Sequence, residues 1–206
     1  MKVLNLQRET EKMQWMNEMR MQMTKEQHES KGAPQQTTAA KEKEILQLSC
    51  ARTNLVNDVK LICKDFAASS AGKKCKLTCR SLVDEIDANI DFGRLEEALT
   101  ILLGNSVRFS PGNCQINVNL GRVGKDKAVI QVADNGIGIR DEFKATAFEP
   151  MLGSEGIGLD RVKDIVVAHG GTIRLEDNPG GGTVFVITLP VEAEVEVEEA
   201  VLMDDE

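Results

Sequence analysis

An aspartate followed by two glycines has the makings of a pocket for a flat ligand that carries an amine. Asp134, Gly136 and Gly138 come after the apolar run at residues 128–133, whose β-branched residues predict a strand. The glycines let the backbone turn and let a planar group approach without a Cβ in the way. The carboxylate can accept a hydrogen bond from an exocyclic amine, such as that of adenine. Alone, the pattern is equally typical of a strand that ends in a glycine turn.

Four other motifs accompany this one in the chain. They are the leucine-rich stretch 94–111, Phe148-Glu149-Pro150-Met151, Gly153-Ser154-Glu155-Gly156-Ile157-Gly158-Leu159, and Gly181-Gly182-Thr183-Val184-Phe185. An Ala-His-Gly-Gly turn at residues 168–171 precedes the last of them. Five motifs in a fixed order are far more specific than any single glycine pattern.

In this order the motifs resemble the ATP-binding domain of sensor histidine kinases, in the superfamily that also contains gyrase, heat-shock chaperones and MutL. The resemblance covers roughly residues 73–190. It implies an α/β two-layer sandwich, the Bergerat ATP-binding fold, with a mixed, mostly antiparallel sheet and helices on one face. We expect a helical segment over residues 1–68, the ATP-binding domain over 69–190 and an acidic tail or linker over 191–206.

The resemblance also implies roles for individual residues. The implied nucleotide-binding positions are Asn105, Asp134, Gly136, Gly138, Phe148, Gly153, Gly156, Gly158, Leu159 and Thr183. Asn105 would be the Mg²⁺ ligand, and Arg108 would contact the triphosphate as a catalytic residue. An amide oxygen suits Mg²⁺, which takes oxygen ligands and keeps waters and phosphate oxygens around it. The alternative is that Asn105 simply ends a helix before a turn.

A helix predicted over residues 93–107 positions these side chains. Its apolar stripe, which should pack on a sheet, consists of Leu95, Leu99, Leu102 and Leu103. At about 100° per residue, Ile101, Asn105 and Arg108 fall together on an adjacent stripe. The predicted helix therefore presents Asn105 beside the core.

Ile101 departs from the family pattern. The hydrolytic branches of the superfamily have a glutamate at this position that activates water, and an isoleucine cannot take a proton. ATP hydrolysis of the gyrase or chaperone type is therefore disfavoured. Histidine kinases usually carry a polar residue there, so Ile101 also departs from the kinase pattern.

The remaining predicted elements complete the domain. They are strands at 114–121, 127–133, 171–176 and 183–189, and helices at 141–147 and 159–168. Glycines before Leu159 put backbone N–H groups at a helix N-terminus, where phosphate binds favourably. Ser154 and Glu155 replace the glycine and threonine common in the family, and the lid between Phe148 and Gly156 is short.

The N-terminal third is predicted to be helical. Residues 1–31 carry a methionine-rich stripe at helical spacing that can pair with a second copy, and a second helix is predicted from Lys41 to Lys64. Residues 54–59 resemble the second helix of the kinase dimerisation hairpin. His28 is the candidate phosphoacceptor, although the stretch after it is too short for a complete first helix and turn. The alternative is an exposed histidine at a helix end.

The charge of the chain is concentrated at one end. The net charge is −8, and residues 191–206 contain eight acidic residues and no basic one, so the rest is about neutral. Without a basic patch, nucleic-acid binding has no support. No apolar run is long enough to span a bilayer, so we expect no membrane contact by this chain. We expect a cytoplasmic protein or the soluble part of a membrane-anchored sensor.

The cysteines suggest neither a zinc site nor a disulfide framework. There are five, with no CxxC spacing and only two histidines in the chain. We therefore expect buried thiols in a reducing compartment.

Three functions fit the sequence. The first is the catalytic part of a homodimeric sensor histidine kinase that uses ATP and Mg²⁺ to phosphorylate a histidine and then a response regulator receiver domain. The second is a degenerate nucleotide-sensing module without kinase activity, which Ile101 and the short lid favour. The third is a serine kinase of the anti-sigma-factor type, against which the hairpin-like helix argues.

Overall fold

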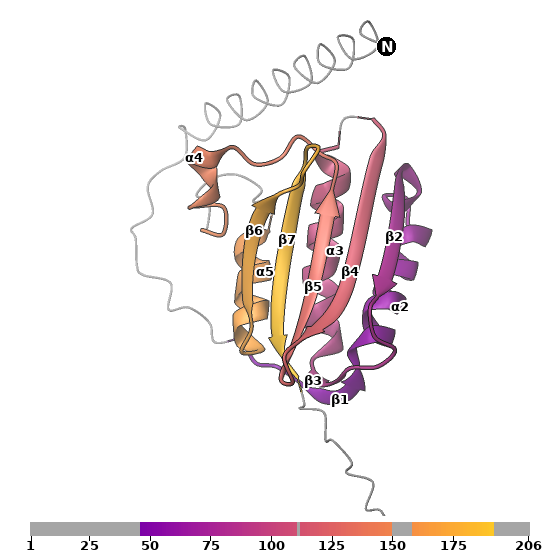
Figure 1. The fold of residues 1–206 in the computed structure, drawn as a ribbon, viewed down its shortest axis with the longest axis vertical. Coiled ribbons are helices and arrows are strands. Elements are labelled where there is room, and N and C mark those ends of the chain that lie inside the picture. Colours follow the sequence, from indigo (N-terminus) through magenta and orange to yellow (C-terminus); the bar gives the residue numbers. More distant parts are fainter. Residues whose placement is uncertain (1–45, 111, 150–157, 192–206) are drawn as a thin grey trace, which may run out of the picture.

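The computed structural model describes residues 46–110, 112–149 and 158–191 (Figure 1). The described elements are β1 (Ala51–Asn54), α2 (Leu55–Ala68), η2 (Gly72–Lys74), β2 (Cys75–Ser81), β3 (Asp87–Ile90), α3 (Phe92–Arg108), β4 (Cys114–Val123), β5 (Lys127–Asp134), α4 (Asp141–Lys144), α5 (Leu159–Ala168), β6 (Thr172–Asp177) and β7 (Thr183–Pro190). Residues 1–45 of the helical segment predicted over 1–68, and residues 192–206 of the acidic tail predicted over 191–206, lie outside the described residues.

A five-stranded sheet forms one layer of the fold. Its strand order is β2-β4-β5-β7-β6, with β2 and β4 parallel and all other neighbours antiparallel. Helices α2, α3 and α5 cover one face, as Figure 1 shows. The predicted α/β sandwich with a mixed, mostly antiparallel sheet is therefore confirmed. A separate two-stranded sheet joins β1 to β3.

Alternation of side chains explains why the central strands form the core. The inward residues of β4, β5 and β7 are Ile116, Val118, Leu120, Ala128, Ile130, Val132, Phe185, Ile187 and Leu189, and all are buried. The pairing of β5 with β7 ends at Ala133 opposite Val184, while Asp134 still pairs with Ile116 of β4. Asp134 therefore lies at the end of a central strand, where the sheet opens.

Helix α3 lies across this sheet as the sequence predicts. Its four leucines Leu95, Leu99, Leu102 and Leu103 are buried. Asp91 begins the helix, because its carboxylate accepts a hydrogen bond from the Arg94 N–H at 3.1 Å. His169, at the end of α5, accepts the Asp91 N–H at 3.1 Å and so ties the two helices together at the end remote from Asn105. In the described residues, none of the helices is both long and apolar enough to cross a membrane.

The helix predicted from Lys41 to Lys64 is wrong over residues 46–54, the part before Leu55 that the structure describes. Ala51–Asn54 is a strand, and the helix begins at Leu55 and continues to Ala68. Asn54 sets this boundary, since its side chain accepts the Val56 N–H at 3.0 Å and so favours a helix start over a helix interior. The buried face of α2 belongs to the same core as the sheet. Residues 54–59 thus form part of the sandwich itself.

The cysteines also differ from the expectation of buried thiols. Cys75 and Cys114 form a disulfide, while Cys50, Cys63 and Cys79 are free. No local pattern predicts this pairing, because these two residues are 39 positions apart and meet only when β2 and β4 pair in parallel. Of the free cysteines, Cys63 is buried on α2 and hydrogen-bonds to Cys79 on β2. That bond, aided by the charge of Lys60, lowers the pKa of the Cys79 thiol to about 7.

Candidate functional site

The carboxylate of Asp134 is the centre of the site. Its side chain is buried, and Oδ1 accepts hydrogen bonds from the N–H groups of Gly136 at 2.9 Å and Thr183 at 3.1 Å. Oδ2 accepts a bond from the Ser106 hydroxyl at 3.2 Å. The Asn178 amide donates to the backbone oxygen of Asp134 at 2.6 Å. Donors from α3, β7 and one loop therefore fix the buried carboxylate, and a donor from a second loop fixes the backbone of the same residue.

Glycines allow the backbone to close around this carboxylate. A Cβ on Gly136 would lie 2.9 Å from both Asp134 Oδ1 and the Phe109 carbonyl oxygen. A Cβ on Gly182 would lie 2.0 Å from the Asp134 carbonyl oxygen, well inside any tolerable contact. Gly138 has φ of +75°, a backbone conformation that favours glycine. The glycines are needed for the fold of the site itself, before any ligand is considered.

The C-terminal end of α3 brings the predicted phosphate-side residues to this centre. Ser106, which bonds to Asp134, directly follows Asn105 in the helix. Asn105 is half-buried, and Arg108 is exposed with its guanidinium 5.5 Å from the centre of the Phe109 ring. The Phe109 carbonyl accepts the Ile137 N–H at 3.2 Å, which joins the helix end to the glycine loop. The proposed roles of Asn105 and Arg108 stay predictions.

The N-terminus of α5 faces the same helix. Gly158 occupies the N-cap with φ of +72°, and the first helical residue, Leu159, is buried. A Cβ on Gly158 would lie 3.1 Å from Cγ2 of Ile101. Ile101 therefore contacts the turn that would hold phosphate, at the position where hydrolytic relatives carry a glutamate. A proton acceptor is absent at that position in this chain.

An ion-pair cluster holds α5 against α3. Glu97 accepts hydrogen bonds from Arg161 at 2.7 and 3.2 Å and from Arg94 at 2.9 Å. The bond from Arg161, followed by that from Arg94, lowers the pKa of the Glu97 carboxyl from its usual range. Arg161 lies in the first turn of α5, so this cluster sets the position of Gly158 relative to Ile101.

Phe148 and Thr183 lie on the sheet side of the site. Phe148 is partly buried against the core, with its ring centre 6.4 Å from that of Phe185 in an edge-on contact. Lys144 of α4 bonds to Asp177 of β6 at 2.7 Å and anchors the segment before Phe148. Thr183 begins β7 and contributes its N–H to Asp134.

Several predicted residues lie outside the described part of the chain. Gly153 and Gly156, with the unusual Ser154 and Glu155, fall within residues 150–157, and His28 falls within residues 1–45. Among the described residues, no three or more His, Cys, Asp or Glu side chains are grouped so as to hold a metal ion.

Three residues of the site were missed from the sequence. They are Ser106, Asn178 and Gly182, of which Gly182 appears in a predicted motif without a role of its own. A signal for Ser106 was present, because it continues the apolar stripe four residues after Leu102 and a polar residue there needs a buried partner. The role of Asn178 depends on a contact 44 residues away and leaves no local pattern.

Comparison with known proteins decides the family. Residues 90–193 match the profile of the family described as histidine kinase-, DNA gyrase B-, and HSP90-like ATPase. The chain belongs to this family. Half of the chain is matched, and the matched part runs from the end of β3 past the end of β7.

Individual relatives agree with this assignment. The chain is 31% identical over 156 residues to the sensor histidine kinase TmoS of Ectopseudomonas mendocina. The aligned region covers 71% of this chain but only 16% of TmoS. The catalytic domain of histidine kinase ThkA has the same fold, with a TM-score of 0.62 at 21% identity, covering 69% of this chain and 96% of that domain. Full-length ShkA in complex with AMPPNP gives a TM-score of 0.64 at 21% identity. The match covers 73% of this chain and 33% of the ShkA chain. ThkA is also known in complex with the response regulator protein TrrA.

The close approach of Gly182 to Asp134 gives a direct test of the site geometry. In Gly182→Ala the new methyl group meets the Asp134 carbonyl, so we expect the free energy of unfolding to fall by about 1–3 kcal/mol more than in the control, as overpacking does. The control is Gly180→Ala, because Gly180 has a similar φ of 103° but no atom within 4 Å of the added Cβ. Urea denaturation measures both. Equal losses in the two variants would show that Gly182 does not pack against Asp134.

Proposed function

We propose that this chain is the ATP-binding catalytic part of a sensor histidine kinase, which transfers the γ-phosphoryl group of ATP to a histidine and then to a response regulator. The observation that carries the proposal is the buried Asp134 carboxylate at the open end of β5, held by Gly136, Thr183 and Ser106. The family assignment and the sensor histidine kinases among the relatives support it. The whole relatives are much longer, since the chain spans about a sixth of TmoS.

Adenine recognition would depend on Asp134. The carboxylate is an acceptor only, so it can bond to the exocyclic amine of adenine but not to a carbonyl at the same place. Its orientation is fixed in advance by its three donors, which reduces the entropy cost of binding. The glycines at positions 136 and 138 leave room for a flat base beside the backbone.

The triphosphate would lie between the end of α3 and the start of α5. Asn105 would hold Mg²⁺ through its amide oxygen, and Arg108 would neutralise phosphate charge. A single amide ligand fits Mg²⁺, because this ion usually completes its shell with phosphate oxygens and waters. When bound, Mg²⁺ supplies charge neutralisation on the transferring phosphoryl group. The N–H groups at the start of α5, which Gly158 does not cap with a side chain, would receive phosphate oxygens.

Ile101 favours transfer to a side chain over hydrolysis. Isoleucine cannot activate a water molecule, and the nearest acid one turn earlier, Glu97, is bonded to two arginines. A neutral imidazole needs no such base, because its ring nitrogen is itself the nucleophile. The chain would therefore contribute positioning and charge neutralisation to the reaction.

Two alternatives differ from this proposal in the phosphoryl acceptor: one has none, and the other uses a serine. A nucleotide-sensing module without kinase activity would account for Ile101, which departs from the polar residue of kinases, but the sensor histidine kinases among the relatives do not favour it. A serine kinase of the anti-sigma-factor type shares the fold. The argument against it from residues 54–59 no longer holds, since α2 packs in the sandwich core. The preference for a histidine kinase over a serine kinase now rests on the sensor histidine kinases among the relatives.

The remaining partners are proposed on the sequence alone. We propose His28 as the phosphoacceptor, pairing of the N-terminal helical segments in a homodimer, and a cytoplasmic location for this chain. The complex of ThkA with TrrA supports a response regulator as the downstream partner.

Calorimetric titration of the full chain with AMPPNP tests nucleotide binding. We expect Mg²⁺-dependent binding with Kd of ~10–100 μM, or about 6 to 7 kcal/mol. Asp134→Ala should abolish it, because the acceptor for adenine is lost, and Asp134→Asn should weaken it while keeping the shape of the site. The exposed acid variant Asp84→Ala should bind as the parent does. No binding to the parent at millimolar AMPPNP would refute the proposed function.

Phosphate incorporation from γ-labelled ATP tests the acceptor. We expect acid-labile label on the parent chain and none on His28→Ala, because a phosphorylated imidazole hydrolyses in acid. Both proteins should bind AMPPNP equally, which separates loss of the acceptor from loss of the site. Equal labelling of the two would exclude His28.

A further inference from the structure

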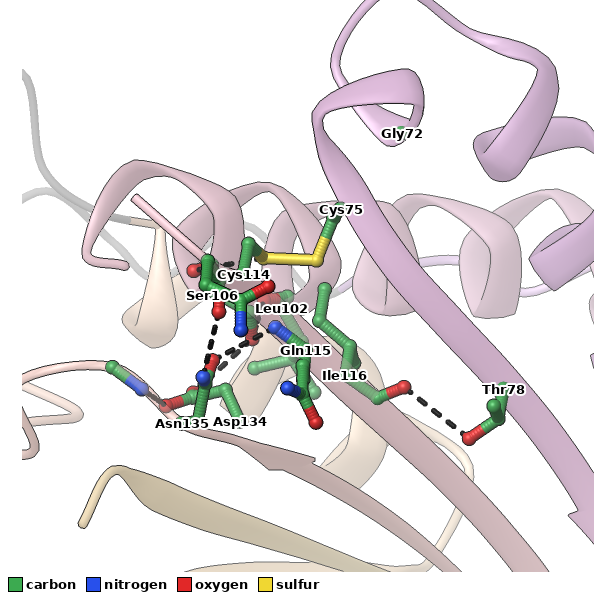
Figure 2. The surroundings of a disulfide bond; sticks show 12 residues. Gly72, Cys75, Thr78, Leu102, Ser106, Cys114, Gln115, Ile116, Asp134 and Asn135 are labelled. Carbon is green, nitrogen blue, oxygen red and sulfur yellow. Dashed lines mark hydrogen bonds between the residues drawn. A yellow bond between two sulfur atoms is a disulfide. The ribbon is translucent and has the colours of Figure 1, made fainter. Parts of the chain in front are cut away.

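The disulfide lies directly behind the candidate site. Cys75 is the first residue of β2 and Cys114 the first residue of β4, and they are paired in the parallel register with Cα atoms 4.6 Å apart. Strand β2 is an edge strand, and β4 is its one neighbour in the five-stranded sheet. The disulfide therefore ties the start of β4 to the edge of the sheet at the same end as Asp134 (Figure 2).

The residues on both sides of Cys114 are bonded to the loop that carries the site. The Gln115 N–H donates to Asn135 Oδ1 at 2.8 Å, and the Asn135 N–H donates to the Gln115 carbonyl at 3.2 Å. The Asn135 side chain also donates to the Asn113 carbonyl at 2.7 Å. Figure 2 shows Asn135 and Asp134 beside this end of β4. Cys114 is thus at the centre of the segment that holds Asn135, the residue after Asp134.

A second connection between the disulfide and Asp134 runs through Ser106 of α3. Sγ of Cys114 lies 3.9 Å from the carbonyl oxygen of Ser106, whose hydroxyl donates to Asp134. Ser106 therefore contacts the disulfide through its carbonyl oxygen and the Asp134 carboxylate through its hydroxyl. Movement at Cys114 would reach Asp134 through Ser106 as well as through Asn135.

We propose that the Cys75–Cys114 disulfide is a redox control of the nucleotide site, and that its reduction by a dithiol weakens nucleotide binding at Asp134. Because nucleotide binding is itself proposed, this regulation rests on the proposed function. Disulfides are rare in reducing compartments, and those that occur in cytosolic proteins are usually transient and catalytic or redox-sensing. A bond placed behind a ligand site fits that role.

Thiol–disulfide exchange with the dithiol would begin at Cys75. Cys75 is half-buried whereas Cys114 is buried, so the Cys75 sulfur is the one open to attack. Exposed Lys74 and Lys76 flank it and favour the approach of a thiolate. The attacking thiolate forms a mixed disulfide with Cys75, and Cys114 leaves as a thiolate that takes up a proton. The second thiol of the reductant then releases Cys75 as a thiol, so two electrons pass to the chain and the dithiol becomes a disulfide.

Reduction should loosen the site for a mechanical reason. Without the covalent link, the start of β4 is held by backbone bonds and by packing alone, and it follows the turn after α3. Larger motion there disturbs the bonds to Asn135 and the contact with Ser106. The Asp134 carboxylate then loses part of its fixed orientation, and binding must restore that order at a cost in affinity.

The test compares AMPPNP affinity of the full chain in its two redox forms by calorimetry. Thiol counting in denaturant should give three free thiols in the oxidised chain and five after dithiothreitol, out of five cysteines. We expect reduction to weaken binding about fivefold or more, the lower end of typical coupling between sites, and reoxidation to restore it. Equal affinities, or five thiols in the chain after aerobic oxidation, would overturn the proposal.

Matched variants separate this disulfide from other thiol effects. The double variant Cys75→Ser/Cys114→Ser should bind AMPPNP like the reduced chain and should not respond to dithiothreitol. The double variant Cys63→Ser/Cys79→Ser keeps the disulfide and should respond like the parent. A response that persists in the first variant, or is lost in the second, would contradict the assignment.

A second measurement separates failure of the redox control from failure of the proposed function. Hydrogen exchange of the Gln115 and Gly136 amides reports on the bond to Asn135 and on the bond to the Asp134 carboxylate without any ligand. We expect both amides to exchange faster after reduction. If AMPPNP binds to neither form, the proposed function fails, and exchange then decides whether the disulfide is coupled to Asp134. Unchanged exchange rates would overturn the coupling itself.

Discussion

A buried carboxylate constrains the whole site, because an acidic group removed from water must be surrounded by donors. Asp134 takes its donors from the end of α3, from the glycine loop after β5 and from the start of β7. Each of these segments can reach it only if its own element is correctly packed on the sheet. The leucine stripe of α3 and the register of β5 with β7 are therefore conditions for the position of a single side chain.

The same arrangement gives helix α3 two separate contacts, one with the proposed adenine site and one with the proposed phosphate site. The side near Ser106 meets Asp134, while Ile101 meets Gly158 at the start of α5. The Glu97–Arg161 pair holds the second contact in place and engages the acid one helical turn before Ile101. At Ile101 the proposed site thus has a side chain that cannot take a proton, and Glu97, one helical turn earlier, is bonded to two arginines, which suits transfer to a nucleophile supplied from elsewhere.

Local patterns predicted those parts of the fold that rest on local physics. The buried stripe of α3, the alternation of β4, β5 and β7, and the helix start at Leu159 follow from periodicity and glycine placement. The failures concern long-range contacts. Strands β1 and β3 are only four residues each, so Ala51–Asn54 was absorbed into a predicted helix. The disulfide depends on a parallel pairing that the sequence does not reveal. Asp134 was found from its motif, whereas Asn178 and Ser106 act through contacts distant in sequence.

The central claim is that the Asp134 carboxylate recognises the amine of adenine. Comparing the affinities of ATP and inosine triphosphate for the unmodified chain, by calorimetry with Mg²⁺, tests it most directly, since inosine has a carbonyl where adenine has its amine, together with an N1–H at the neighbouring ring atom. The account predicts that ATP binds more tightly by about 1–3 kcal/mol, because the inosine carbonyl cannot donate to the carboxylate and would place one acceptor against another. Equal affinities would mean that Asp134 supports the fold of the site without reading the base.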